Sequence, residues 1–180
     1  LQRSRLISYF ATDLRDLDLC VYVLREGNLV HDSGDCRALL LPSEVECLSP
    51  PEVTEHDWLE QAFRWRATAS LPPFADAASL LRQAHLQERR LFGTLNGHVA
   101  MAAPFGAVPS RSDRRRQPSG LLLAVRASDS VRVLPTHAEM TCLKALETRL
   151  ARSAADERWF GTIAQLSERV QTLSGQQSPH

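Results

Sequence analysis

Two apolar runs joined by a basic connection constrain the fold of this chain most strongly. His98–Phe105 and Gly120–Arg126 are short, rich in apolar residues and bounded by turn-forming residues, a pattern typical of buried β-strands. A third apolar run, Leu91–Thr94, is followed by Asn96-Gly97, and this dipeptide favours a tight hairpin because both residues tolerate positive φ. We therefore predict three strands that pair side by side, with the Arg-rich segment as a lengthened hairpin connection.

The first third of the chain predicts a helix followed by a second hairpin. Leu6, Phe10, Leu14 and Leu17 recur at helical spacing, which predicts an amphipathic helix over residues 2–16. Two apolar runs then flank a tight turn at Glu26-Gly27-Asn28, so a strand over residues 19–24 should pair with one that begins at Leu29. Further short strands around residues 38–41 and 45–48 are compatible with the pattern.

Two helices are predicted between these hairpins. Thr54 or Glu55 opens the first, which carries several aromatic residues and ends before Pro72-Pro73. Asp76 is a predicted N-cap for the second, because a short side chain with an oxygen acceptor satisfies a free N–H group of the first helical turn.

The C-terminal region predicts two more helices. Pro135-Thr136 opens a helix that runs to about Ser153, and after a break near Ala155-Asp156 the apolar residues recur at spacings of four and three. A helix with so short an apolar seam is only marginally stable by itself. We therefore expect it to pack on the first helix or on a second copy of the chain. We predict a homodimer bundle built from residues 1–16 and 136–174, with a seam of Leu6, Phe10, Leu14, Trp159, Ile163, Leu166, Val170 and Leu173.

The order of these elements predicts an α+β fold, with an antiparallel central sheet flanked by helices and with the N- and C-terminal helices packed together on one face. The segments HVAMAAPFG, GLLLAVRASDSVRVLP and THAEMTCLKALETRLA resemble a GAF domain, a sensory fold related to PAS, and the resemblance covers roughly residues 5–153. PAS or longin-like modules share this layout and stay as alternatives. We expect a single domain over residues 1–174 and a disordered tail over 175–180.

The resemblance implies a small-molecule pocket built from mid-chain aromatic residues and the adjoining strands. Its candidate residues are Trp65, Phe74, Phe92 and His98. The alternative is that the aromatic residues only fill the core. If the pocket held haem, His98 would be the first candidate ligand and His85 the second. The sequence lacks the Asn-Lys-Phe-Asp-Glu set of the family's cyclic-nucleotide members and the Cys-His dipeptide that attaches a bilin, so we predict no cofactor.

The connection over residues 106–119 is predicted to be flexible, because Ser, Arg, Gln and Pro bury little apolar surface. Either it is a solvated loop, or Arg111, Arg114, Arg115 and Arg116 bind an acidic protein or a phosphate-bearing partner. The net charge of the chain is zero and no aromatic residue lies between these arginines, which argues against nucleic acid.

Nothing in the sequence predicts an enzyme or a metal site. The four cysteines form no CxxC pair, and His31-Asp32-Ser33-Gly34-Asp35-Cys36 is explained by an Asx-type turn. No nucleophile has an evident base, so we predict no catalytic residues. Buried free thiols, the absence of a signal peptide and the lack of an apolar stretch long enough for a membrane span favour a cytoplasmic protein.

The chain begins at Leu1 without a Met, which leads us to expect a piece of a longer polypeptide with an attached output domain. The predicted function is a non-enzymatic sensory or regulatory module that dimerises through its terminal helices and relays a signal to that domain. The alternative is a ligand-free scaffold that docks an acidic partner through the Arg-rich loop.

Overall fold

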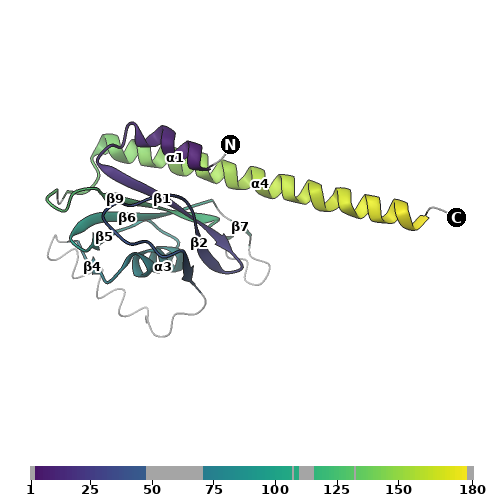
Figure 1. Cartoon of the computed structure of the whole chain (residues 1–180), viewed down its shortest axis with the longest axis horizontal. Coiled ribbons are helices and arrows are strands. Elements are labelled where there is room, and N and C mark those ends of the chain that lie inside the picture. Colours follow the sequence, from purple (N-terminus) through teal and green to yellow (C-terminus); the bar gives the residue numbers. More distant parts are fainter. Residues whose placement is uncertain (1–2, 48–70, 107, 110–115, 132, 178–180) are drawn as a thin grey trace.

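A computed structural model describes residues 3–47, 71–106, 108–109, 116–131 and 133–177. Its centre is a curled seven-stranded sheet with helices on both faces (Figure 1). The strand order is β3-β2-β1-β9-β6-β5-β4. The strands are β1 (Leu17–Arg25), β2 (Asn28–Gly34), β3 (Glu44–Glu46), β4 (Pro73–Phe74), β5 (Leu91–Leu95), β6 (His98–Phe105) and β9 (Gly120–Arg126). The helices are α1 (Arg3–Ala11), α3 (Ala77–Gln87) and α4 (His137–Gln177).

The two apolar runs that flank the Arg-rich connection are neighbours in this sheet, as predicted. β6 pairs with β9 in antiparallel register, with Ala102 opposite Leu123. Within the connection between β6 and β9, two further short strands pair with each other. β7 (Val108–Pro109) and β8 (Arg116–Gln117) form a separate two-stranded antiparallel sheet. The connection therefore extends from the end of the β6–β9 pair as a second, shorter ladder.

The hairpin between β5 and β6 is also confirmed. Asn96 and Gly97 have φ values of 48° and 84°, and Leu95 pairs with His98 across the turn. The seven-stranded sheet is antiparallel except at its edge, where the two residues of β4 run parallel to β5. The Asn-Gly signal thus fixes the register of this pair, because positive φ at both positions gives a turn whose twist matches the strands.

Two hydrophobic clusters, one on each face of the sheet, form the core. α1 and α4 cover one face with residues that include Leu6, Phe10, Leu143 and Leu146. α3 covers the other face, and its Asp76 carboxylate accepts the Ser79 N–H at 2.8 Å, which confirms the predicted N-cap. Figure 1 shows α1 and α4 together on one side and α3 on the other. The predicted α+β architecture, with the terminal helices on one face, is confirmed.

The predicted break in the last helix is wrong. α4 runs without interruption from His137 to Gln177, through Ala155-Asp156 and into the segment predicted as a disordered tail. Ala and Asp both tolerate a helix interior, Ala best of all residues. The feature that resembled a break is a change in which side of the helix carries the apolar residues.

The polar segment from His31 to Gly34 is strand rather than turn. β2 continues to Gly34, which pairs with Cys20 of β1 at a φ of 83°. A Cβ at position 34 would lie 2.0 Å from the Leu19 carbonyl oxygen, so only glycine fits there. No strand forms over residues 38–41, where Leu39 packs against the α3-side cluster, whereas the strand predicted over 45–48 is β3. The helix predicted from Thr54 lies outside the described residues.

Candidate interaction surface on the last helix

The start of α4 is fixed by a reciprocal cap. The Thr136 N–H donates to Glu139 Oε1 at 2.9 Å, and the Glu139 N–H donates to Thr136 Oγ1 at 3.1 Å. This capping box satisfies N–H groups that have no partner within the helix. Glu139 also lies in the first turn, where a negative charge is favoured by the helix dipole.

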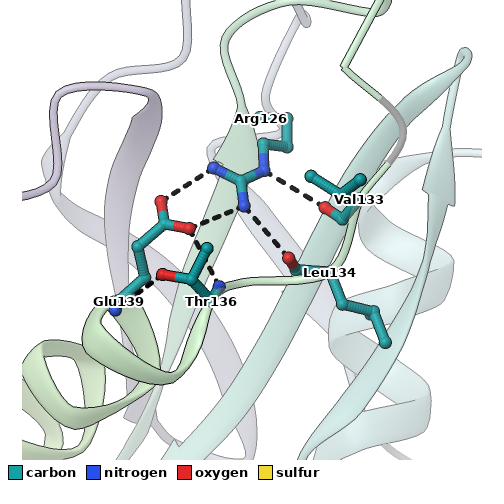
Figure 2. Close-up of polar contacts among 5 residues, drawn as sticks. All are labelled: Arg126, Val133, Leu134, Thr136 and Glu139. Carbon is teal, nitrogen blue, oxygen red and sulfur yellow. Dashed lines mark hydrogen bonds and ion pairs between the residues drawn. The ribbon is translucent and has the colours of Figure 1, made fainter.

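A buried arginine binds the same carboxylate. The Arg126 side chain, 4% exposed at the end of β9, donates to both oxygens of Glu139 at 2.7 Å and to the carbonyls of Val133 and Leu134 at 3.2 and 3.1 Å (Figure 2). The hydrogen bonds from Arg126 lower the pKa of Glu139 and outweigh the opposing effect of burial. This group ties the end of the sheet, the connecting loop and the first turn of α4 together.

The proximal half of α4 is held by hydrophobic packing. Leu143, Leu146, Leu150 and Ala154 are buried in the cluster between the helix and the sheet. α1 lies beside this half of α4 and contributes to the same cluster (Figure 1). The proximal half is therefore part of the core of the chain itself.

A second buried arginine joins α1, β2 and the middle of α4. The Arg3 side chain, 8% exposed, donates to both carboxylate oxygens of Asp32 at 2.8 and 3.0 Å, and its Nη1 lies 2.9 Å from Glu157 Oε2. Burial would raise the pKa of Asp32, but the hydrogen bonds and the charge of Arg3 lower it. This ion pair ties α1 and β2 to α4 at Glu157.

Beyond Glu157 the helix leaves the sheet. Figure 1 shows α4 continuing far past the strands to the C-terminus. All residues from 155 to 175 are exposed, and a stripe of large apolar side chains among them is 41–67% exposed. We call this the distal stripe, and it consists of Trp159, Phe160, Ile163, Leu166, Val170 and Leu173.

The distal stripe points away from the side of α4 that packs on the sheet. Leu146, which is buried against the sheet, and Leu173 are 27 residues apart in the sequence, as are Leu143 and Val170. At 3.6 residues per turn, 27 residues make about seven and a half turns. The two apolar faces of α4 therefore lie about half a turn apart, so the distal stripe cannot be an extension of the core-facing surface.

The structure separates the residues of the predicted dimer seam. Leu6, Phe10 and Leu14 are buried within the single chain, where they pack between α1, the sheet and the proximal half of α4. The other five seam residues belong to the distal stripe and are exposed. Of the predicted seam, only the residues in the distal stripe are thus exposed to a partner in the described structure.

The candidate pocket residues are not brought together. Phe74 of β4 packs on the α3 side of the sheet, whereas Phe92 of β5 packs on the side of α1 and α4. His98 lies at the start of β6, with Nδ1 2.9 Å from the Arg126 carbonyl oxygen. The structure thus places the Phe74 and Phe92 rings on opposite faces of the sheet, and the small-molecule pocket stays a prediction. Trp65 lies outside the described residues.

The remaining candidates are tested only in part. Arg111, Arg114 and Arg115 lie outside the described residues, and of Arg116 the structure gives only the backbone pairing with Pro109. The Arg-loop partner stays a prediction. Cys20, Cys36 and Cys47 are buried and unpaired, and burial raises the pKa of Cys20 to about 12, so this thiol is not activated.

Within the described ranges, no group of three or more His, Cys, Asp or Glu side chains is placed to hold a metal ion. In the same part of the chain, no helix combines the length and apolarity needed to cross a membrane.

Sequence patterns could have revealed part of this surface. Thr136-His-Ala-Glu139 has the spacing of a capping box. The heptad spacing identified the distal stripe, apart from Phe160. No local signal marks Arg3 and Asp32, which are 29 residues apart, or the pairing of Arg126 with Glu139 across a loop.

A scan against models of known protein families finds no match, and a search of curated proteins finds none. Among solved structures, the chain is similar to the inducer-binding domain of the transcription factor PobR from Acinetobacter, crystallised as a double mutant with 3-hydroxybenzoic acid. The two are 15% identical with a TM-score of 0.44, over 82% of this chain and 94% of that one.

Two further similar structures are an IclR transcriptional regulator from Alicyclobacillus acidocaldarius and the repressor BlcR from Agobacterium tumefaciens. Each is 11% identical and is matched over 84% of this chain, with TM-scores of 0.44 and 0.41. The match covers 66% of the first and 68% of the second. At these identities and TM-scores the likeness says nothing of the function of this chain.

Proposed function

We propose that this chain is a non-enzymatic regulatory module that associates with a second copy of itself through the distal stripe of α4. The observation that carries the proposal is the exposure of six large apolar side chains on one side of a helix that has left its own core. Contiguous exposed apolar surface of this kind marks an interaction site more often than it serves the stability of a monomer.

The packing of α4 in the described residues supports a second copy of the chain as the partner. In proteins, most of the stability of a helix comes from tertiary packing of its apolar face. In the described structure the proximal half of α4 packs on the sheet and α1, and the distal half packs on neither. The heptad spacing of the distal stripe fits a second helix of the same kind.

The expected affinity is moderate. Full burial of one large apolar side chain is worth about 1.5–3 kcal/mol, and these side chains are already about half covered. Five seam residues from each copy would together contribute on the order of 10 kcal/mol, whereas association costs about 4–15 kcal/mol. We therefore expect a reversible dimer that must be measured over a range of concentrations.

The regulatory part of the proposal is supported by the Arg3 contacts. Arg3 joins Asp32 in the sheet to Glu157, which lies two residues before Trp159 at the start of the distal stripe. A change that moves β2 or α1 would alter the support of α4 at this point. A ligand or partner would regulate pairing only if it bound the two arrangements with different affinity.

Analytical ultracentrifugation of an Ile163→Asp/Leu166→Asp variant tests the proposal. Wild type should sediment as a concentration-dependent dimer, and the variant as a monomer with an unchanged far-ultraviolet circular dichroism signal from the sheet. The matched control is Gln165→Asp/Thr172→Asp, which places the same two charges on exposed positions of α4 outside the seam. If wild type is monomeric at every concentration, or if the Ile163→Asp/Leu166→Asp variant remains dimeric, the proposal is wrong.

A further inference from the structure

The distal stripe has a heptad assignment that its spacing determines uniquely. Without Phe160, the intervals along the stripe from Trp159 to Leu173 are four, three, four and three residues, so Ile163 and Val170 occupy a positions. The d positions are Trp159, Leu166 and Leu173. The core of the seam thus has β-branched residues at a and mainly leucine at d.

From this pattern we infer that the second copy binds in parallel and in register, as a two-stranded coiled coil. The inference rests on the proposed function, since it specifies the partner and orientation at the same surface. β-branched residues at a combined with leucine at d favour two strands in parallel coiled coils, because of how these side chains enter the holes of the facing helix.

The number of apolar layers also selects the parallel arrangement. In a parallel pair each a or d residue meets its own counterpart, so all five residues form matched layers. In an antiparallel pair a residues lie opposite d residues, and two a positions can match only two of the three d positions. One layer is then lost: either Leu173 lies opposite Asp156 of the second copy, or Trp159 lies opposite the polar residue at position 177.

The flanking positions are compatible with this arrangement. Arg169 is the one charged residue at the e and g positions between residues 160 and 174, so parallel pairing brings no like charges together there. In a parallel pair the e residue Phe160 lies beside the g residue Ala155 of the second copy, and both are exposed in the single chain. A small residue opposite Phe160 leaves room for the ring to cover the end of the seam.

The orientation also keeps the two folded domains apart. The distal stripe lies about half a turn from the side of α4 that packs on the sheet. Two copies joined along their stripes would each hold the sheet on the outer side of its own α4. The polar residues Arg152 and Asp156 occupy the next d and a positions before Trp159, so the seam begins just beyond Ala154, the last buried residue of α4.

A disulfide formed at position 173 tests the orientation. The Leu173→Cys change is made together with Cys142→Ser, because Cys142 is the one cysteine among the four that is not fully buried. In the parallel pair the two introduced thiols face each other, and oxidation with diamide should convert most of the protein into a covalent dimer. In either antiparallel register the two positions lie 10 or 17 residues apart along the axis, about 15 or 25 Å, which is beyond the roughly 7 Å between Cα atoms that a disulfide allows.

The matched control is Glu168→Cys in the same background, an exposed f position on the outer side of α4 that should not cross-link. The mass in solution is measured on the same samples before oxidation. A dimer that cross-links at 173 and not at 168 supports the inference. A dimer that does not cross-link at 173 overturns the parallel orientation while the proposed function stands, and a trimer overturns the two-stranded assignment. A monomer overturns both.

Discussion

Glu139→Gln should destabilise the fold far more than a surface carboxylate change would. The substitution keeps the size of the side chain but leaves the buried guanidinium of Arg126 without a counter-charge, and it weakens the reciprocal cap with Thr136. Removing one partner of a buried ion pair costs about 3–5 kcal/mol. Arg126 keeps the carbonyls of Val133 and Leu134, so we expect the lower end, about 3 kcal/mol. With a urea m-value of about 2 kcal/mol per molar, the unfolding midpoint should fall by about 1.5 M.

The same chain supplies the control. Glu157 also pairs with a buried arginine, but its side chain is 58% exposed, against 16% for Glu139. Solvent screening limits such a pair to less than about 1 kcal/mol, so Glu157→Gln should move the urea midpoint by under about 0.5 M. If the two variants unfold at the same midpoint, the buried pair is not what anchors α4. The double variant Arg126→Met/Glu139→Gln should lose less free energy of unfolding than the sum of the losses in the two single variants, because both changes remove the same interaction.

The dependence of stability on acidic pH gives an independent check of the contact between Arg126 and Glu139. The hydrogen bonds from Arg126 lower the pKa of Glu139 below its ordinary value of 4.5. A depressed carboxyl pKa contributes stability that is fully present above the unfolded-state pKa and is lost as pH falls through the folded-state pKa. The stability of wild type should therefore fall more steeply below about pH 4.5 than that of Glu139→Gln, whose side chain does not titrate. The free energy of unfolding is measured in urea at several pH values from 3 to 5. If it changes with pH by the same amount in wild type and in Glu139→Gln, this account is wrong.

Three further predictions concern single positions. Gly34→Ala should destabilise by at least about 2 kcal/mol in urea unfolding, because its Cβ would meet the Leu19 carbonyl and its φ is positive; a change under 0.5 kcal/mol would contradict the packing at that point. Gly161→Ala has open space around its Cβ in α4 and should raise helicity at 222 nm and stabilise by up to about 1 kcal/mol. Burial lowers the pKa of His85 in the fold, so its contribution to stability is present above pH 6.5 and is lost as pH falls. His85→Leu should therefore show a smaller drop in Tm between pH 7 and pH 5 than wild type.

The parts of the fold that the sequence predicts are those with a local physical cause. The Asn96-Gly97 turn, the Asp76 cap and the strand Gly120–Arg126 each depend on residues close together in the chain, and all three are confirmed. The strand through Ser33 was missed because its polar residues are held by pairing with β1 rather than by their own preference. The contact of Arg3 with Asp32 depends on the tertiary fold, so no local pattern could indicate it.

The sequence could not indicate which face of the sheet each predicted pocket residue occupies. Phe74 and Phe92 are close in sequence and both aromatic, but the face that each occupies depends on strand register. A shift of one residue moves a side chain to the opposite face of a sheet. Composition alone therefore cannot decide whether two aromatic residues line one cavity or fill two separate halves of a core.

The mistaken break in α4 has a more general physical origin. Residues 143–154 direct their apolar side chains to one side of the helix, and residues 159–173 direct theirs to the other. Averaged over the whole helix, two stripes half a turn apart cancel, so the helix as a whole lacks a clear apolar face although each half has one. A shift of the apolar stripe within an unbroken helix separates a face that packs in the chain's own core from a face that the described residues leave exposed. For a helix that continues past its sheet, the position of that shift, here between Ala154 and Trp159, marks where packing on the sheet ends and where the surface for the proposed partner begins.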